Sequence, residues 1–219
     1  MSLVLAIATA MVLILWGVLR KKQPAGVPKP VFVRRFIHPG HTWMKETEDG
    51  DVLVGMDEFA VNLIGTIDDV TLPRLLKKVK QGEPAWYVRH NNRIVPLVSP
   101  VTGRVIEKNE MVRHNPQIVN TSPYTDGWLL RIRPRKMQAQ LNNLFAGRAA
   151  HQWLEQARAR LVALFSEESI LMYQDGGELL RDFADRLSDE EWKQVAREFL
   201  LTDSETIDAS TMKKGVPQW

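Results

Sequence analysis

The segment Arg89–Arg93 carries the side chains of this sequence that are best suited to binding a ligand. Its five residues are Arg89, His90, Asn91, Asn92 and Arg93. Guanidinium groups bind carboxylates and phosphates through paired N–H donors, and they also stack on planar groups. Two arginines around an amide pair therefore form a candidate site for an anionic or planar ligand. The alternative is a solvated turn that binds nothing.

Metal binding has little support in this sequence. His38 and His41 are three residues apart, but a zinc site needs three or four converging ligands. Cysteine is absent, which excludes thiolate ligands. A single pair of histidines beside Pro39 and Gly40 favours core or loop histidines over ligands. We expect neither a metal nor a cofactor.

Catalytic motifs are also missing. The chain has no thiol nucleophile, no Gly-x-Ser-x-Gly motif and no apparent pairing of a nucleophile with a base. Residues 175–178 are glycine-rich but lack the Lys-Ser/Thr of a phosphate-binding loop, so they favour a turn that leads into a helix at Glu178. The acidic run from Asp182 to Glu191 is typical of a solvated helix face. We expect a protein that is not an enzyme.

The candidate site lies between two segments that are predicted to be strands. Runs rich in β-branched and aromatic residues flank it within Tyr87–Val105, and asparagine tolerates the positive φ of a tight turn. The predicted structure is a hairpin with Asn91 and Asn92 at its tip. Short apolar runs separated by Gly, Pro and Asp continue from Phe36 to about Pro134, which predicts a small β domain with one or two helical turns.

The residues after Pro134 favour helices. Apolar side chains recur there at spacings of three and four, and Ser188 with Glu191 forms a capping box that should start the last helix. Most aromatic side chains of this part are expected in the core. Trp219 ends a tail without periodicity, which either inserts into a partner groove or frays into solvent.

The first residues predict a membrane anchor. Ser2–Leu19 carries no charge and is just long enough to cross a bilayer as a helix. Up to Lys45 there are seven Lys or Arg and no acid, leaving 22 bases against 26 acids in the remainder. This asymmetry predicts that everything after Arg20 lies in the cytoplasm. The basic pI of about 9.2 then indicates a membrane surface rather than nucleic acid.

These patterns divide the chain into five parts: a transmembrane anchor over residues 1–22, a Pro-rich basic linker over 23–35, the β domain over 36–135, a helical domain over 136–203, and a tail over 204–219. The Arg-rich stretch at the junction of the two predicted domains should face anionic lipid or an acidic partner. Its candidate contact residues are Arg131, Arg133 and Arg135.

The β domain resembles the H protein of the glycine cleavage system. Nine blocks occur in consecutive order, among them Gly40-His41-Thr42-Trp43, Val54-Gly55-Met56-Asp57-Glu58-Phe59-Ala60, Gly82-Glu83-Pro84, Ser99-Pro100-Val101-Thr102-Gly103 and Pro123-Tyr124-Thr125-Asp126-Gly127-Trp128-Leu129. The resemblance implies a lipoyl-domain-like core, a barrel-sandwich hybrid of two small antiparallel sheets. In that family a lysine at a hairpin tip carries lipoate as an amide and moves an aminomethyl group between enzymes.

The resemblance places the lipoyl position at Asn92. The family's lysine follows the Gly of Gly-Glu-Pro by ten residues and precedes the Pro of Ser-Pro-Val by eight, and both counts reach Asn92. Arg89, Asn91 and Arg93 replace the family's glutamate, valine and alanine. Lys80 and Lys108 could take the role only if two flanking blocks were out of register. An amide is not a substrate for a lipoyl ligase, so the resemblance implies a tip without covalent lipoate.

Two functions are consistent with these features. The first is a non-catalytic docking or scaffold subunit, anchored in the bacterial inner membrane, with its β and helical domains on the cytoplasmic side and a multi-span protein complex as its partner. The second is a tethered carrier-like or regulatory protein of glycine cleavage or lipoate metabolism.

Overall fold

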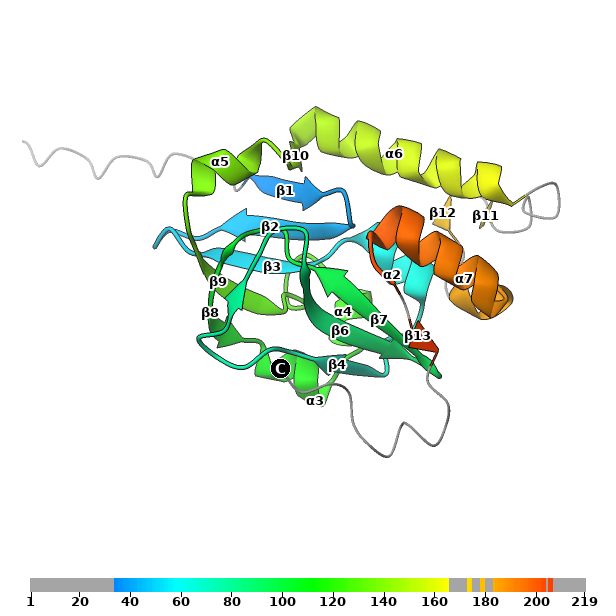
Figure 1. The fold of residues 1–219 in the computed structure, drawn as a ribbon, viewed down its shortest axis with the longest axis horizontal. Coiled ribbons are helices and arrows are strands. Elements are labelled where there is room, and N and C mark those ends of the chain that lie inside the picture. The colour runs from blue at the N-terminus through cyan, green and yellow to red at the C-terminus, as the bar shows by residue number, and fades with distance from the viewer. Residues whose placement is uncertain (1–33, 166–172, 175–177, 180–182, 204, 207–219) are drawn as a thin grey trace, which may run out of the picture. The chain divides into compact units, whose positions relative to one another are not determined.

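The computed structural model describes residues 34–165, 173–174, 178–179, 183–203 and 205–206 (Figure 1). These residues belong to one compact unit. No helix in this described part is long and apolar enough to cross a bilayer. The apolar run Ser2–Leu19 and the tail that ends at Trp219 lie outside the described residues, so the anchor and the tail stay predictions.

The larger sheet has seven antiparallel strands in the order β10-β1-β2-β3-β9-β8-β5. Residues 122–128 form turns that precede the strand beginning at Leu130. The bounds are β1 Arg35–His38, β2 Thr42–Glu46, β3 Val52–Met56, β5 Lys78–Val79, β8 Gly103–Lys108, β9 Leu130–Pro134 and β10 Phe145–Ala146.

The smaller sheet contains the candidate site. Its order is β13-β7-β6-β4, with bounds β13 Glu205–Thr206, β7 Arg93–Val98, β6 Pro84–His90 and β4 Asp69–Thr71. All six residues of β7 are buried. A strand without an exposed face must be covered on both sides, and the C-terminal helical turn η3 (Ala196–Leu200) packs against β7. Both sheets are antiparallel, as the resemblance to the H protein implies.

Short helices connect the strands. Asp57 caps α2 by accepting from the backbone N–H of Ala60 at 2.9 Å, and Asn109 caps α3 in the same way through Met111. The bounds are α2 Glu58–Ile64, α3 Glu110–His114, α4 Ile118–Thr121, α5 Met137–Leu141 and α6 Gly147–Leu164.

The part predicted as helical, residues 136–203, also contains short strands, among them β10 of the larger sheet. Glu178–Leu179 is a strand, β12, paired with β11 (Tyr173–Gln174), so the helix expected at Glu178 is wrong. A 3-10 turn, η2 (Phe183–Arg186), and α7 (Asp189–Val195) follow. The predicted capping box is confirmed, because Ser188 and Glu191 bond each other's backbone N–H. Hydrogen bonds from Ser188 lower the pKa of Glu191.

The C-terminal helices share the core of the sheets. Phe183, Trp192 and Phe199 are fully buried, as predicted for aromatic residues of this part, and they belong to one hydrophobic cluster with Trp86 of β6. The boundary predicted near residue 135 therefore does not separate two hydrophobic cores. Helix α6 lies along β1 and β10 at the top of Figure 1, with Trp153 stacked on Phe145 at a ring distance of 4.9 Å.

Candidate functional site

The predicted hairpin is present, and its tip is Asn91-Asn92. Strands β6 and β7 pair up to His90 and Arg93, which leaves the two asparagines as the connection. Asn91 has a left-handed backbone conformation, with a φ of 52°. Asparagine tolerates this conformation better than most residues and therefore suits the turn. Both asparagines are exposed. The sequence therefore folds locally as expected, and the tip projects two neutral amides.

Arg93 does not face solvent. The residue is only 8% exposed, and its guanidinium donates to the carbonyl oxygens of Ala184 and Leu187, the latter at 2.7 Å from Nη2. Asp189 lies 3.6 Å from Nη2, and the ring of Trp192 lies 5.3 Å from the guanidinium carbon. All these partners lie in the segment that contains η2, α7 and η3, which we call the C-terminal segment. The prediction of Arg93 as a ligand-binding arginine is wrong, because the chain itself occupies its donors.

His90 is held in the same way. It is 3% exposed, its Nδ1 lies 2.6 Å from Thr66 O, and its Nε2 lies 2.8 Å from Asp185 Oδ1. Asp185 also accepts from Asn91 Nδ2 at 2.9 Å. Thus Asp185 fastens both His90 and the first residue of the turn.

Arg89 is the more accessible arginine of the tip. It lies half-exposed with Nη1 3.7 Å from Asp68 Oδ2, and Asp68 also accepts from the backbone N–H of Asn91 at 2.6 Å. The five predicted residues are thus brought together, but they do not form two free guanidinium forks around an amide pair. The exposed Asn91 and Asn92 and the half-exposed Arg89 remain the surface that a partner can reach, although the Asn91 amide already donates to Asp185.

The residues that complete this site came from a run interpreted as a solvated helix face. Asp185 and Asp189 instead point to the hairpin, whereas Glu190 pairs with Lys193 at 3.8 Å and Glu191 caps its helix. The charge match between a positive tip and this acidic run was the available signal. It was missed because the two segments lie more than 90 residues apart.

The second group of predicted contact residues divides in two. Arg131 lies 2.7 Å from Asp49, 3.4 Å from Asp51 and 3.5 Å from Glu107, so its charge is compensated within the chain. Arg133 is 68% exposed and pairs with Asp51 at 3.1 Å. Arg135 is exposed, and it makes no ion pair within the part of the chain that the structure describes. Arg133 and Arg135 therefore stay available to a partner, and Arg131 does not.

His38 and His41 are buried, as expected for core histidines. His41 lies 2.8 Å from Asp57 and stacks on Phe59 at 4.1 Å. Nδ1 of His38 accepts from the backbone N–H of Gly40 at 3.0 Å. Burial, and then the proximity of His41, lowers the pKa of His38 to about 4. Within the described residues, no group of three or more His, Cys, Asp or Glu side chains could hold a metal ion.

The lysines considered as alternatives to Asn92 lie away from the tip. Lys80 precedes β6 and pairs with Glu83 at 2.9 Å, whereas Lys108 ends β8 in the larger sheet and lies 3.7 Å from Glu110.

A surface depression of about 170 Å³ between α2 and α4 presents amides and hydroxyls without a carboxylate, imidazole or amine; its lining residues are Val61, Asn62, Gly65, Thr66, Gln117, Asn120 and Thr121.

Sequence comparisons with known proteins match the part of the chain that forms most of the two larger sheets. A sequence model of the Glycine cleavage H-protein family matches residues 34–157. The chain is 32% identical over 115 residues to a probable glycine cleavage system H protein of Pyrococcus furiosus, covering 52% of this chain and 85% of that protein. It is 38% identical over 93 residues to a glycine cleavage system H protein of Streptomyces avermitilis, covering 42% and 74%.

A solved structure is similar as well. The crystal structure of a glycine cleavage system H protein from Mycobacterium marinum matches with 28% identity and a TM-score of 0.49, covering 56% of this chain and 94% of that chain. The family match ends inside α6, so η2, α7 and η3, which hold the hairpin, lie beyond it. From the first strand to the middle of α6, the sequence carries the family's pattern, and the chain belongs to the glycine cleavage H-protein family.

Proposed function

We propose that this chain is a non-catalytic, membrane-anchored H-protein-like subunit that acts as a docking or scaffold module without covalent lipoate. The family is one of glycine cleavage carriers. The proposal keeps the family's fold and removes the carrier chemistry. It assigns the chain to the cytoplasmic side of a bacterial inner membrane, beside a multi-span partner.

The observation that carries the proposal is the state of the hairpin tip. The spacing of the blocks that resemble the family supports Asn92 as the lipoyl position, and a carboxamide lacks the primary amine that forms the lipoyl amide. The tip is also restrained: His90 and Arg93 bind Asp185, Ala184 and Leu187 of the C-terminal segment. A carrier hairpin has to present its arm to several enzymes, whereas this hairpin is fixed to its own chain.

Membrane attachment is supported by the sequence alone. Ser2–Leu19 is uncharged, and Arg20, Lys21 and Lys22 follow it directly. Protease added outside spheroplasts should then spare the residues beyond Arg20. Digestion of the β domain under those conditions would reverse the proposed orientation.

The partner follows from what the chain lacks. A subunit without a catalytic group acts through contacts, and a single membrane helix is well suited to pack against other helices. Mild detergent should therefore extract the chain together with at least one multi-span protein. Deletion of Met212–Trp219, which lies outside the described residues, should weaken this association without unfolding the chain. A chain that migrates alone at native expression would contradict the scaffold role.

Intact-mass spectrometry tests the absence of lipoate directly. The full chain is expressed with a lipoyl ligase and free lipoate, and a lipoylated H protein expressed in the same cells is the positive control. The expected result is an unmodified mass for this chain and a lipoyl increment for the control. A lipoyl increment on any peptide of this chain would overturn the proposal in favour of a tethered carrier.

A further inference from the structure

The loop between β4 and β5 exposes two leucines among cations. Residues 74–80 read Arg-Leu-Leu-Lys-Lys-Val-Lys and contain no acid. Leu75 is 51% exposed and Leu76 is 63% exposed. Single apolar side chains are common on protein surfaces, but two adjacent exposed leucines within a run of four cations combine the two features that favour binding to a lipid headgroup layer.

The backbone holds Leu76 in an unfavourable conformation. Its φ is +66°, which is rare for a bulky side chain that has no local hydrogen bond to offer. The loop is fixed there by two hydrogen bonds to β8, from Leu76 N to Val105 O at 2.8 Å and from Val105 N to Lys77 O at 3.0 Å. The strained residue is also the exposed one, so burial in the described part of the chain does not compensate the strain. Such outliers often mark functional surfaces.

A row of three cations lies beside this loop. Lys78 of β5 is directly opposite Arg104 of β8, and Arg104 is directly opposite Arg133 of β9. Directly paired residues of antiparallel strands point to the same face, and like charges in these positions repel each other. We name Lys78, Arg104 and Arg133 the cationic ladder. All three side chains are exposed.

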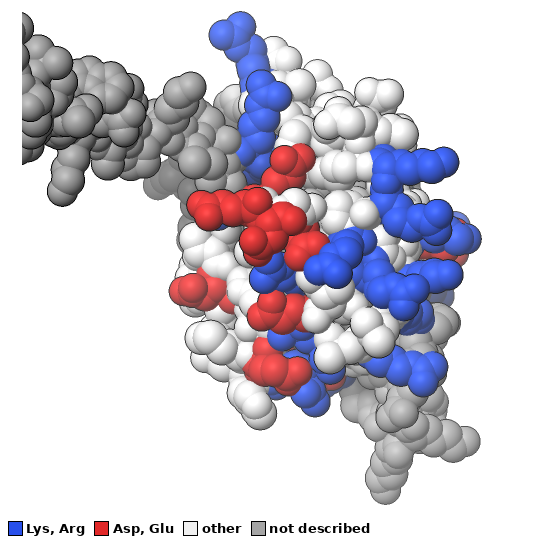
Figure 2. Space-filling view, turned by 90° about the vertical axis from the view of Figure 1, so that its left-hand side faces the viewer, with Lys and Arg blue, Asp and Glu red and all other residues white. Residues whose placement is uncertain are grey.

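The cationic ladder is poorly compensated. Arg133 pairs with Asp51 at 3.1 Å, but among the described residues neither Lys78 nor Arg104 makes an ion pair. Partial burial, and then the nearby charge of Arg74, lowers the pKa of Lys77 in the same loop. Figure 2 shows Lys and Arg side chains gathered over one part of the face that it presents. This arrangement is one that an external anionic surface would stabilise.

Protection of a sheet edge explains only part of the arrangement. Strand β5 is the edge of the larger sheet, and an edge lysine such as Lys78 discourages pairing with another chain. Arg104 and Arg133, however, lie on inner strands. Edge protection also gives no reason to expose Leu75 and Leu76, because apolar side chains promote association.

We propose that the β4–β5 loop and the cationic ladder dock on an anionic phospholipid bilayer. Leu75 and Leu76 enter the headgroup region, and Lys78, Arg104 and Arg133 contact lipid phosphates. The inference rests on the proposed membrane attachment. Residues 20–33, even if fully extended, reach about 50 Å, so an anchored chain keeps this surface within reach of the bilayer.

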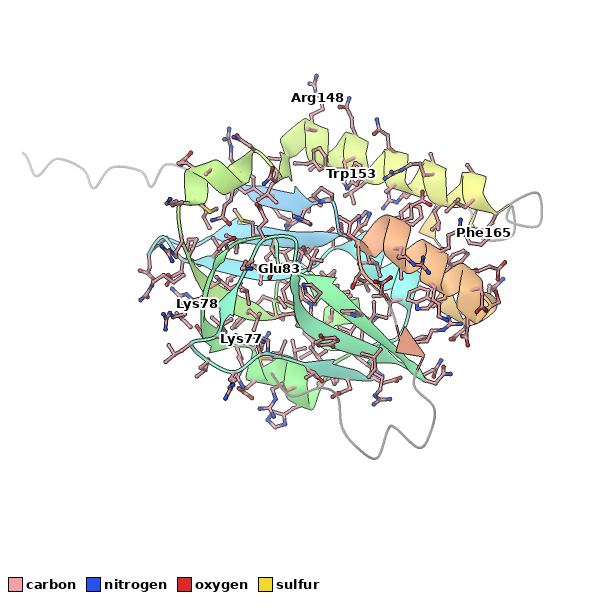
Figure 3. The ribbon with its side chains drawn as sticks, in the orientation of Figure 1. Lys77, Lys78, Glu83, Arg148, Trp153 and Phe165 are labelled. Carbon is pink, nitrogen blue, oxygen red and sulfur yellow. The ribbon has the colours of Figure 1, made fainter. Side chains whose placement is uncertain are left out.

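The absence of cysteine allows a site-specific test on the full chain. Leu76→Cys is labelled with an environment-sensitive nitrobenzoxadiazole group, and the chain is reconstituted in vesicles of phosphatidylcholine alone or with a third of phosphatidylglycerol. Leu164→Cys, at the end of α6, carries the control label. Figure 3 shows that its neighbour Phe165 lies on the opposite side of the molecule from Lys77 and Lys78, so this label is far from the proposed docking surface.

The expected result is a blue-shifted, brighter Leu76 label in the anionic vesicles only, reversed by high salt, with no change at Leu164. Lys78→Gln with Arg104→Gln should lower the ratio of docked to undocked chain about thirtyfold, since each cation near an anionic surface changes it about fivefold. The matched control, Lys193→Gln with Arg197→Gln, removes the same charge from α7 and η3 and should leave the ratio unchanged.

Flotation of the vesicles separates this inference from the proposed function. A chain that floats with both vesicle types while its Leu76 label stays in water overturns the docking surface but leaves the anchor intact. That outcome would indicate that the cationic ladder binds an acidic protein partner instead of lipid. A chain that fails to float with neutral vesicles but whose Leu76 label responds to anionic ones overturns the anchor and supports the docking surface.

Discussion

Arg93 and Leu187 are joined by a hydrogen bond of 2.7 Å between guanidinium Nη2 and a backbone carbonyl, across 94 residues of sequence. Because the guanidinium is buried, no water can replace this contact without opening the structure. The bond therefore couples the hairpin tip to the segment that contains η2, α7 and η3. Loosening one should loosen the other.

Arg93→Lys should release the C-terminal segment. A lysine ammonium cannot reproduce the two donors that the guanidinium directs at Ala184 O and Leu187 O. Leaving one buried carbonyl unpaired costs about 2 kcal/mol. Hydrogen exchange of the full chain in detergent should show a lower opening free energy, by that amount, for amides of α7 and η3.

Arg89→Lys on the same hairpin is the control for this change. Its half-exposed contact with Asp68 at 3.7 Å should contribute less than about 1 kcal/mol, as surface pairs do. Equal effects of the two substitutions would mean that the buried contacts of Arg93 do not hold the segment.

Asn92→Lys alone should not make the tip a substrate for lipoylation. The new amine would stand between Asn91 and Arg93 instead of the family's valine and alanine, and Arg89 would replace its glutamate. A ligase would also have to approach beside residues 184–189, which bind His90 and Arg93. Intact-mass measurement after expression with a ligase should show no lipoyl increment. An increment on this single variant would show that the surrounding surface is still recognised.

Stability should fall in mild acid because of His38. Its pKa is about 4 in the folded chain against an ordinary value of 6.5, so below pH 6.5 the unfolded chain binds more protons than the folded one. The contribution of neutral His38 to the free energy of unfolding is complete above pH 6.5. It decreases as the pH falls toward 4, and the total loss is about 3 kcal/mol. Protonation of Nδ1 would also break its bond from Gly40 N.

Urea unfolding at several pH values between 7.5 and 4.5 measures this loss. His38→Gln should be less stable at neutral pH and should lose less stability on acidification than the parent chain. His114→Gln, which changes an exposed histidine of α3, is the control and should keep the parent's acid sensitivity. An unchanged slope in His38→Gln would exclude His38 as the source.

The parts of the fold that could be predicted are those fixed by neighbours in sequence. The turn at Asn91-Asn92 and the capping box of Ser188 and Glu191 depend on residues within four positions of one another, and both are present. The burial of Phe183, Trp192 and Phe199 followed from their apolar character.

The environment of the tip could not be predicted in this way. His90 and Arg93 are polar residues of a turn, and such residues are usually exposed. Their burial requires a cover that begins at Phe183, and local periodicity does not indicate which surface a distant helix will cover. The prediction of a helix at Glu178 was wrong for a similar reason. Glu178 and Leu179 form a strand because they pair with Tyr173 and Gln174.

His90 and Asp185 should be energetically coupled. Their side chains meet at 2.8 Å, and Asp185 is about half exposed, so a coupling of about 1 kcal/mol is expected rather than the larger values of buried pairs. A double-mutant cycle with His90→Gln and Asp185→Asn, measured as the opening free energy of α7 amides, gives this term. Asp49→Asn, which removes a partner of Arg131 in the other sheet, should instead add to His90→Gln without coupling. If the two cycles give the same coupling, the contact between His90 and Asp185 does not fasten the tip. The restraint would then rest on the contacts of Arg93 and on the bond between Asn91 and Asp185.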